Sequence, residues 1–190
     1  MAQIKKLNKK QSKFVLASIK ERLAFYELTA HMNYGLHYVS DQEGYESYDA
    51  IFTNESQIRC IGEIKVRKHN SSDYATEWIL EKIKYDALTD SIEGRLLPHL
   101  KLKPVYICFF YDCVAIWDLN KVNPNSFFWG KFKETSVDGN EELKDKEVCY
   151  LDIKDAQIIN YILDFDKVSF QAKGIFKFQY PLNSKDILNA

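Results

Sequence analysis

The stretch Pro104–Phe110 reads Pro-Val-Tyr-Ile-Cys-Phe-Phe and is apolar at every position. A strand with one solvated face would alternate between apolar and polar residues, so a continuous apolar run predicts a strand buried on both faces. Such a strand needs a layer of structure on each side of its sheet. Together with the order of the helices and strands predicted below, the run indicates an α/β fold with a central mixed sheet.

Two segments before this run show helical spacing of their apolar residues. Spacings of three and four predict a helix over about Gln11–Met32, which Asn33-Tyr34-Gly35 ends with Gly35 as the left-handed residue. A second helix is expected over about Asp73–Asp90, with Ser72 or Asp73 as its N-cap. Further strands are expected at Leu36–Ser40, Tyr48–Thr53, Ile58–Val66, Ala115–Leu119, Phe127–Glu134 and Val148–Ile153, with an acidic loop at Val137–Glu147, a last helix near Asp155–Leu163 and an aromatic tail after it.

The totals predict one globular domain, residues 1–190, without disulfides. The chain has 26 basic and 27 acidic residues, which excludes a polycation and argues against tight non-specific binding of nucleic acid. Positive charge is concentrated in the first 22 residues, as a solvated arm or as phosphate contacts. The local basic residues are Lys5, Lys6, Lys9, Lys10, Lys13, Lys20 and Arg22.

The cysteine spacing and the N-terminal sequence indicate the cellular compartment of the protein. None of the four cysteines forms a C-x-x-C pair, and no histidine lies near them at zinc-ligand spacing. The N-terminus lacks the apolar core of a signal peptide, and no run approaches 18 apolar residues. We therefore expect a reduced, soluble, cytoplasmic protein that does not associate with membranes.

Charged residues occupy the two strands joined by the turn Asn54–Gln57. Alternation along Ile58–Val66 places Glu63 and Lys65 on one face, and pairing with the preceding strand brings Asp49 beside Glu63. Two carboxylates and an ammonium group then converge. A solvated sheet face would be an ordinary explanation for these charges, and a metal site is the alternative.

Carboxylate oxygens in this arrangement suit Mg²⁺, which binds one or two protein carboxylates together with water and substrate phosphate oxygens. A bound metal ion lowers the pKa of its water and stabilises charge on a scissile phosphate. Lys65 would orient or deprotonate the attacking water, and the backbone carbonyl of Ile64 offers another oxygen ligand. The pattern therefore indicates phosphodiester hydrolysis.

These residues resemble the P-D…(D/E)-x-K signature of the restriction-endonuclease-like, or PD-(D/E)XK, nuclease superfamily: Asp49, thirteen intervening residues, then Glu63-Ile64-Lys65. The likeness covers about residues 11–119 and implies the α-β-β-β-α-β core, with a C-terminal β/α extension over about 120–190. Tyr48 stands where the signature has proline, a position that varies in the superfamily. The resemblance implies that Asp49, Glu63 and Ile64 bind the metal and that Asp49, Glu63 and Lys65 are catalytic.

Members of the superfamily often add an acidic residue from the first helix. Glu21 lies within an apolar stripe, where an unpartnered carboxylate would be costly, and is preferred to Glu27 on the polar edge. In the second helix, Glu81 and Tyr85 resemble the Q-x-x-x-Y element of exonuclease-like branches, with Glu in place of Gln. Lys82 and Lys84 on the same helix are expected to reach nucleic-acid phosphate.

The expected function is that of a nuclease dependent on Mg²⁺ or Mn²⁺ that hydrolyses phosphodiester bonds in DNA. Many nucleases of this superfamily pair to cut two strands, so a homodimer is left open. The alternative is a catalytically inactive nuclease-fold protein that acts as a nucleic-acid-binding or protein-interaction module. Neither of the nucleotide-binding motifs G-x-x-x-x-G-K-[ST] and G-x-G-x-x-G occurs, so the chain is expected to act without binding ATP itself.

Overall fold

The computed structural model describes residues 9–40, 47–74, 76–92, 101–133 and 142–179. Lys5, Lys6 and the first part of the expected acidic loop lie outside these ranges. The helices are α1 (Lys9–His31), α2 (Lys82–Ile92) and α3 (Phe165–Gln179). The strands are β1 (Gly35–Val39), β2 (Ala50–Thr53), β3 (Arg59–Val66), β4 (Trp78–Glu81), β5 (Lys103–Phe109), β6 (Val114–Asp118), β7 (Phe128–Lys133), β8 (Leu143–Leu151) and β9 (Gln157–Ile159).

The strands form a six-stranded sheet in the order β1-β2-β3-β5-β6-β9 and a three-stranded sheet in the order β4-β8-β7. In the larger sheet β3 and β5 run parallel, and the other neighbours run antiparallel. All residues of β5 after Lys103 are buried, as the apolar run predicts. The α/β class and the mixed sheet are thus confirmed.

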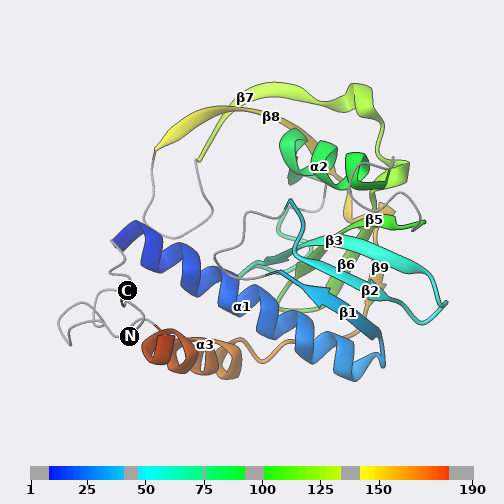
Figure 1. Ribbon diagram of the computed structural model, residues 1–190. Coiled ribbons are helices and arrows are strands. Elements are labelled where there is room, and N and C mark those ends of the chain that lie inside the picture. The colour runs from blue at the N-terminus through cyan, green and yellow to red at the C-terminus, as the bar shows by residue number, and fades with distance from the viewer. Residues whose placement is uncertain (1–8, 41–46, 75, 93–100, 134–141, 180–190) are drawn as a thin grey trace.

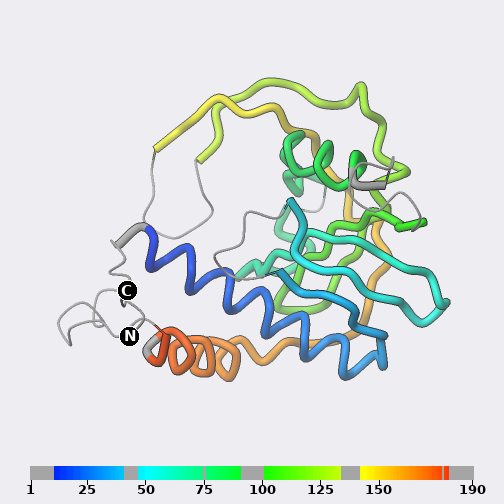
Figure 2. Tube along the Cα trace, viewed as in Figure 1, coloured from blue at the N-terminus to red at the C-terminus, as the bar shows by residue number. Residues whose placement is uncertain are grey.

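Two layers cover the larger sheet (Figure 1). Each layer forms its own core with the sheet. On one face α1 packs against Ile64 and Ile107, and α3 lies antiparallel beside α1 (Figure 2). On the other face Ile61 and Trp117 pack beneath α2 and the smaller sheet. The carboxyl ends of β3 and β5 therefore lie between two buried layers.

The end of α1 differs from the expectation in one residue. Asn33, with φ of 52°, takes the left-handed conformation, and Gly35 instead begins β1. Asparagine is the commonest alternative to glycine at such a position because its short polar side chain tolerates the left-handed region.

The helix expected over Asp73–Asp90 is wrong in its first half. Residues Trp78–Glu81 form β4, and α2 begins only at Lys82. Trp78 and Leu80 are buried while Ile79 between them is 37% exposed, which is the alternation of a strand. Pairing with β8 overrides the helical spacing. Asp73 accepts a hydrogen bond from the Asn70 N–H in a turn instead of capping a helix.

The C-terminal third also departs from the expectations. Strand β8 begins at Leu143, inside the segment expected to be an acidic loop. Where a helix was expected at Asp155–Leu163, β9 adds an edge strand to the larger sheet. The aromatic tail forms α3, whose Ala172 and Phe176 pack against Val15 and Ile19 of α1. This part of the chain therefore completes both the sheet and its helical layer.

The four cysteines are buried and form no disulfide. Burial raises the pKa of the Cys60 thiol to about 11, so this residue behaves as a small apolar side chain. In the part of the chain that the structure describes, no helix has the length and apolar character needed to cross a membrane.

The alternation in β4 can be tested by two neighbouring substitutions. Leu80→Ala should lower the free energy of unfolding by about 2–5 kcal/mol, because Leu80 is fully buried. Ile79→Ala should cost less than about 1 kcal/mol, because Ile79 is 37% exposed. Chemical denaturation of both variants measures the difference. A larger loss for Ile79→Ala would mean that the segment is helical in the protein.

Candidate active site

Asp49 and Glu63 are brought together by the β2–β3 hairpin. Ala50 pairs with Gly62, and the Asp49 N–H donates to the Gly62 carbonyl oxygen at 2.8 Å. Asp49 therefore lies just before β2 and extends its register by one residue, opposite Glu63. The hairpin places the two carboxylates as the sequence predicts.

The Lys65 ammonium group lies among three oxygens from two elements. Its Nζ is 2.8 Å from Glu63 Oε1 and 3.3 Å from Glu21 Oε1 of α1. The same Nζ donates to the carbonyl oxygen of Ile64 at 2.9 Å. Burial alone would lower the pKa of Lys65, but the carboxylates of Glu21 and Glu63 outweigh it and raise that pKa well above its usual value. Lys65 is therefore a fixed positive charge in this state.

Asp49 is held by a guanidinium group and by the backbone. Arg22 Nη2 donates to Asp49 Oδ1 at 2.8 Å, and the Ile64 N–H donates to Asp49 Oδ2 at 2.7 Å. Arg22 also donates to Ser40, from Nε to the carbonyl oxygen at 3.2 Å and from Nη2 to Oγ at 2.6 Å. Sequence reasoning counted Arg22 only among the basic N-terminal residues. Its place beside Glu21 on α1 was the available signal.

Glu63 is only 1% exposed and lies between two ammonium groups. Besides Lys65, Lys84 of α2 donates to Glu63 Oε2 at 3.1 Å. Burial by itself raises the pKa of Glu63, but Lys65 and Lys84 outweigh it and hold the pKa below its usual value. Glu63 is thus a buried carboxylate that stays ionised because of its neighbours.

Of the two candidate acids on α1, the structure brings Glu21 and not Glu27 to this cluster. Burial raises the pKa of Glu21, more strongly than the attraction to Lys65 lowers it. Glu27 points elsewhere: its carboxylate lies 2.6 Å from Lys167 Nζ of α3 and accepts from the Tyr161 hydroxyl at 3.3 Å. Glu27 therefore links α1 to the C-terminal part of the chain.

The remaining expected residues lie around α2. Glu81 ends β4 and pairs with Lys146 of β8 at 2.6 Å, and Lys82 pairs with Asp86 at 2.7 Å. The Tyr85 ring packs on Phe127, with centroids 5.1 Å apart. Because Glu81 belongs to a strand, it and Tyr85 do not form the one-turn helical pair that the sequence suggested. Lys84 alone of this group contacts the cluster.

The carboxylates of the cluster are neutralised by the chain's own cations. Within the described ranges, no group of three or more His, Cys, Asp and Glu side chains is arranged so that it could hold a metal ion. The donor chemistry nevertheless fits a hard divalent cation, because Glu63, Glu21 and the Ile64 carbonyl already surround one positive charge with oxygens. A metal ion would have to replace an ammonium or guanidinium group.

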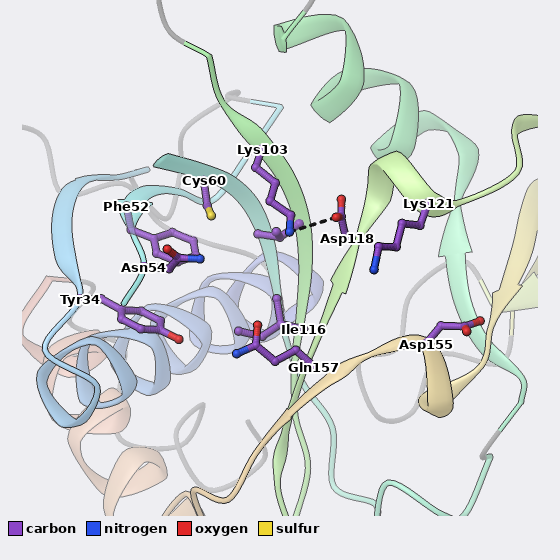
Figure 3. Close-up of a pocket in the computed structure, with 11 residues that line it drawn as sticks. Tyr34, Phe52, Asn54, Cys60, Lys103, Ile116, Asp118, Lys121, Asp155 and Gln157 are labelled. Atoms are coloured by element: carbon purple, nitrogen blue, oxygen red, sulfur yellow. Dashed lines mark ion pairs between the residues drawn. The ribbon is translucent and has the colours of Figure 1, made fainter. Parts of the chain in front are cut away.

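A separate cavity of about 130 Å³ lies at the other end of β3 (Figure 3). Tyr34 and Cys60 line it together with the ion pair of Lys103 and Asp118, whose Nζ and Oδ2 are 3.0 Å apart. None of the residues expected in the active site borders it. The cavity is therefore distinct from the carboxylate cluster.

The chain matches no protein-family model, no curated protein and no solved structure. The geometry and chemistry of the cluster are therefore the basis for inferring a function.

The buried position of Glu63 predicts a large effect of its charge on stability. In metal-free protein, Glu63→Gln should lower the free energy of unfolding by about 3 kcal/mol, because Lys65 loses a buried partner. Glu81→Gln is the matched control: its carboxylate is 38% exposed, and its loss should cost less than about 1 kcal/mol. Denaturation in the presence of a chelator measures both.

The difference in stability between wild type and Glu63→Gln should depend on pH. Because the pKa of Glu63 is held below its ordinary value of 4.5, its stabilising contribution is full above that pH and is lost as the pH falls through the lowered value. The difference between wild type and Glu63→Gln should therefore shrink below about pH 4.5. A difference that stays constant down to strong acid would contradict the ion pairs around Glu63.

Proposed function

We propose that this chain is a divalent-metal-dependent nuclease that hydrolyses phosphodiester bonds in DNA, on a restriction-endonuclease-like core. The observation that carries the proposal is the convergence of Asp49, Glu63, Lys65 and Glu21 from a hairpin and a helix on one spot. Buried carboxylates are costly, so a cluster of them beside a lysine is more typical of a working site than of a plain sheet face.

Each residue has a distinct role in this proposal. Glu63, Glu21, Asp49 and the Ile64 carbonyl would hold Mg²⁺ or Mn²⁺ through oxygen. When bound, the metal would lower the pKa of its water and stabilise charge on the scissile phosphate. Lys65, as a fixed ammonium group, orients the attacking water and neutralises phosphate oxygens.

Lys84, on α2, has two roles in the proposed nuclease. In the metal-free state it balances Glu63 at 3.1 Å, and its side chain is 39% exposed. A metal ion on Glu63 would take over that balance and leave Lys84 to contact a phosphate of the substrate. DNA is therefore the partner that we propose. A homodimer would provide two active sites if both strands are cut.

A second candidate is a catalytically inactive protein on the same fold that binds nucleic acid or another protein. The observation that favours it is the full engagement of Asp49, with Oδ1 on Arg22 and Oδ2 on the Ile64 N–H. In a former metal site that no longer binds metal, the carboxylate oxygens would be expected to be occupied by protein donors in this way. Metal binding separates the two candidates.

The direct test is cleavage of supercoiled, linear and branched DNA with Mg²⁺ or Mn²⁺. Lys65→Ala should reduce metal-dependent cleavage by about 100-fold or more, because it removes a charge that acts on the reacting groups. Lys101→Ala is the control, since Lys101 is exposed and lies near the start of β5, at the opposite end of the sheet. The measurement is the initial rate on each substrate.

The outcomes differ in meaning. Cleavage lost in Lys65→Ala and kept in Lys101→Ala supports the nuclease and identifies the preferred DNA. Equal cleavage by all three proteins indicates a contaminant and contradicts the role of Lys65. Absence of cleavage by folded wild type on every substrate favours the inactive module.

A further inference from the structure

Arg22 occupies one oxygen of Asp49, a carboxylate of the proposed metal site. This contact is unusual because the positive charge of Arg22 cannot be removed by deprotonation. Nη2 of Arg22 lies 2.8 Å from Oδ1 of Asp49, and each side chain is only 12% exposed. Arginine stays protonated at every pH that a protein tolerates. Asp49 can therefore be freed only by moving the guanidinium group.

Lys65 stands in a different relation to the cluster. Its ammonium group contacts Glu63, Glu21 and the Ile64 carbonyl. Arg22 also lies near Glu21, with Nη1 3.8 Å from Oε2, but its shorter contact, at 2.8 Å, is with Asp49. Arg22 is therefore the cation that occupies Asp49. A divalent ion on Oδ1 of Asp49 would meet the guanidinium group at close range, and the two positive charges would repel each other.

Ser40 provides a second anchor for Arg22. The guanidinium group donates from Nε to the Ser40 carbonyl oxygen at 3.2 Å and from Nη2 to Ser40 Oγ at 2.6 Å. Both acceptors belong to Ser40, whose N–H donates to the Asp49 carbonyl oxygen at 2.8 Å, and neither involves the Asp49 carboxylate. They would keep Arg22 beside the cluster after its contact with Asp49 is broken, where a planar guanidinium group is well suited to bind phosphate.

We propose that Arg22 competes with the divalent metal for Asp49, so that metal binding displaces the guanidinium group and leaves it, held by Ser40, to meet the substrate phosphate. This inference rests on the proposed metal-dependent nuclease. Arg22 then has two roles: it keeps Asp49 ordered without metal, and it contacts the substrate phosphate with metal.

The test is calorimetric titration of Mn²⁺ into wild type, Arg22→Gln, Arg22→Lys and Arg59→Gln. Arg22→Gln should bind Mn²⁺ about tenfold more tightly than wild type, because no charged hydrogen bond to Asp49 has to be broken. Arg22→Lys keeps the charge but loses the forked contact with Asp49 and Ser40, so its affinity should lie between the two. Arg59→Gln removes an exposed positive charge at the start of β3 and should bind as wild type does.

Several results would overturn the inference. Equal or weaker binding by Arg22→Gln, with wild type binding metal, contradicts the competition but leaves the proposed function intact. Tighter binding by Arg22→Gln with wild-type binding by Arg22→Lys means a general charge effect and also contradicts it. No binding by any of the proteins rejects both the inference and the metal-dependent nuclease.

Folding must be checked, because Arg22 and Asp49 are both largely buried. Circular dichroism and thermal unfolding of each variant, with and without Mn²⁺, serve this purpose. If Arg22→Gln does not fold, Arg22→Lys carries the test alone, and binding tighter than wild type supports the competition. Binding equal to or weaker than wild type then overturns it.

Discussion

Strand β3 is buried on both faces over Cys60–Ile64, and this burial governs the charged cluster near its carboxyl end. Ile61 and Ile64 are both fully buried, and they belong to the cores on opposite sides of the sheet. Glu63 lies between them and is 1% exposed. An ionised carboxylate in such a place is tolerated only when cations and hydrogen bonds compensate for lost hydration. The surrounding elements supply them.

The compensation comes from three directions. The strand itself contributes Lys65, α2 contributes Lys84, and α1 contributes Arg22 to the neighbouring Asp49. Glu21 adds a third carboxylate beside Lys65. Glu21, Glu63 and Asp49 are thus each in contact with at least one of Lys65, Lys84 and Arg22. The nuclease and the inactive module differ in whether this balance is a resting state that metal disturbs or the permanent state of the cluster.

Local patterns predicted much of this arrangement. Alternation along β3 and the turn before it placed Asp49 beside Glu63 with Lys65 next along, and the observed register agrees. Glu21 was preferred because it lies within an apolar stripe of α1, and it is the acid that contacts Lys65, whereas Glu27 contacts Lys167. The apolar run at β5 predicted a strand covered on both sides. These features depend on neighbours within a few residues or within one hairpin, so their spacing is visible in the sequence.

The misplaced elements depend on distant partners. Residues Trp78–Glu81 have helical spacing but form a strand, because β8 pairs with them from about 70 residues further along. The C-terminal residues that form β9 and α3 are likewise set by the edge of β6 and the surface of α1.

The sequence by itself determined the mixed sheet, the charged hairpin and its candidate acids, because strand alternation and helical spacing are local. Only the tertiary structure decided which cation faces which carboxylate: Arg22 on Asp49 and Lys84 on Glu63. The physical reason is that a long basic side chain takes its partner from whatever the packing of helices and strands brings within reach. No spacing along the chain encodes that choice.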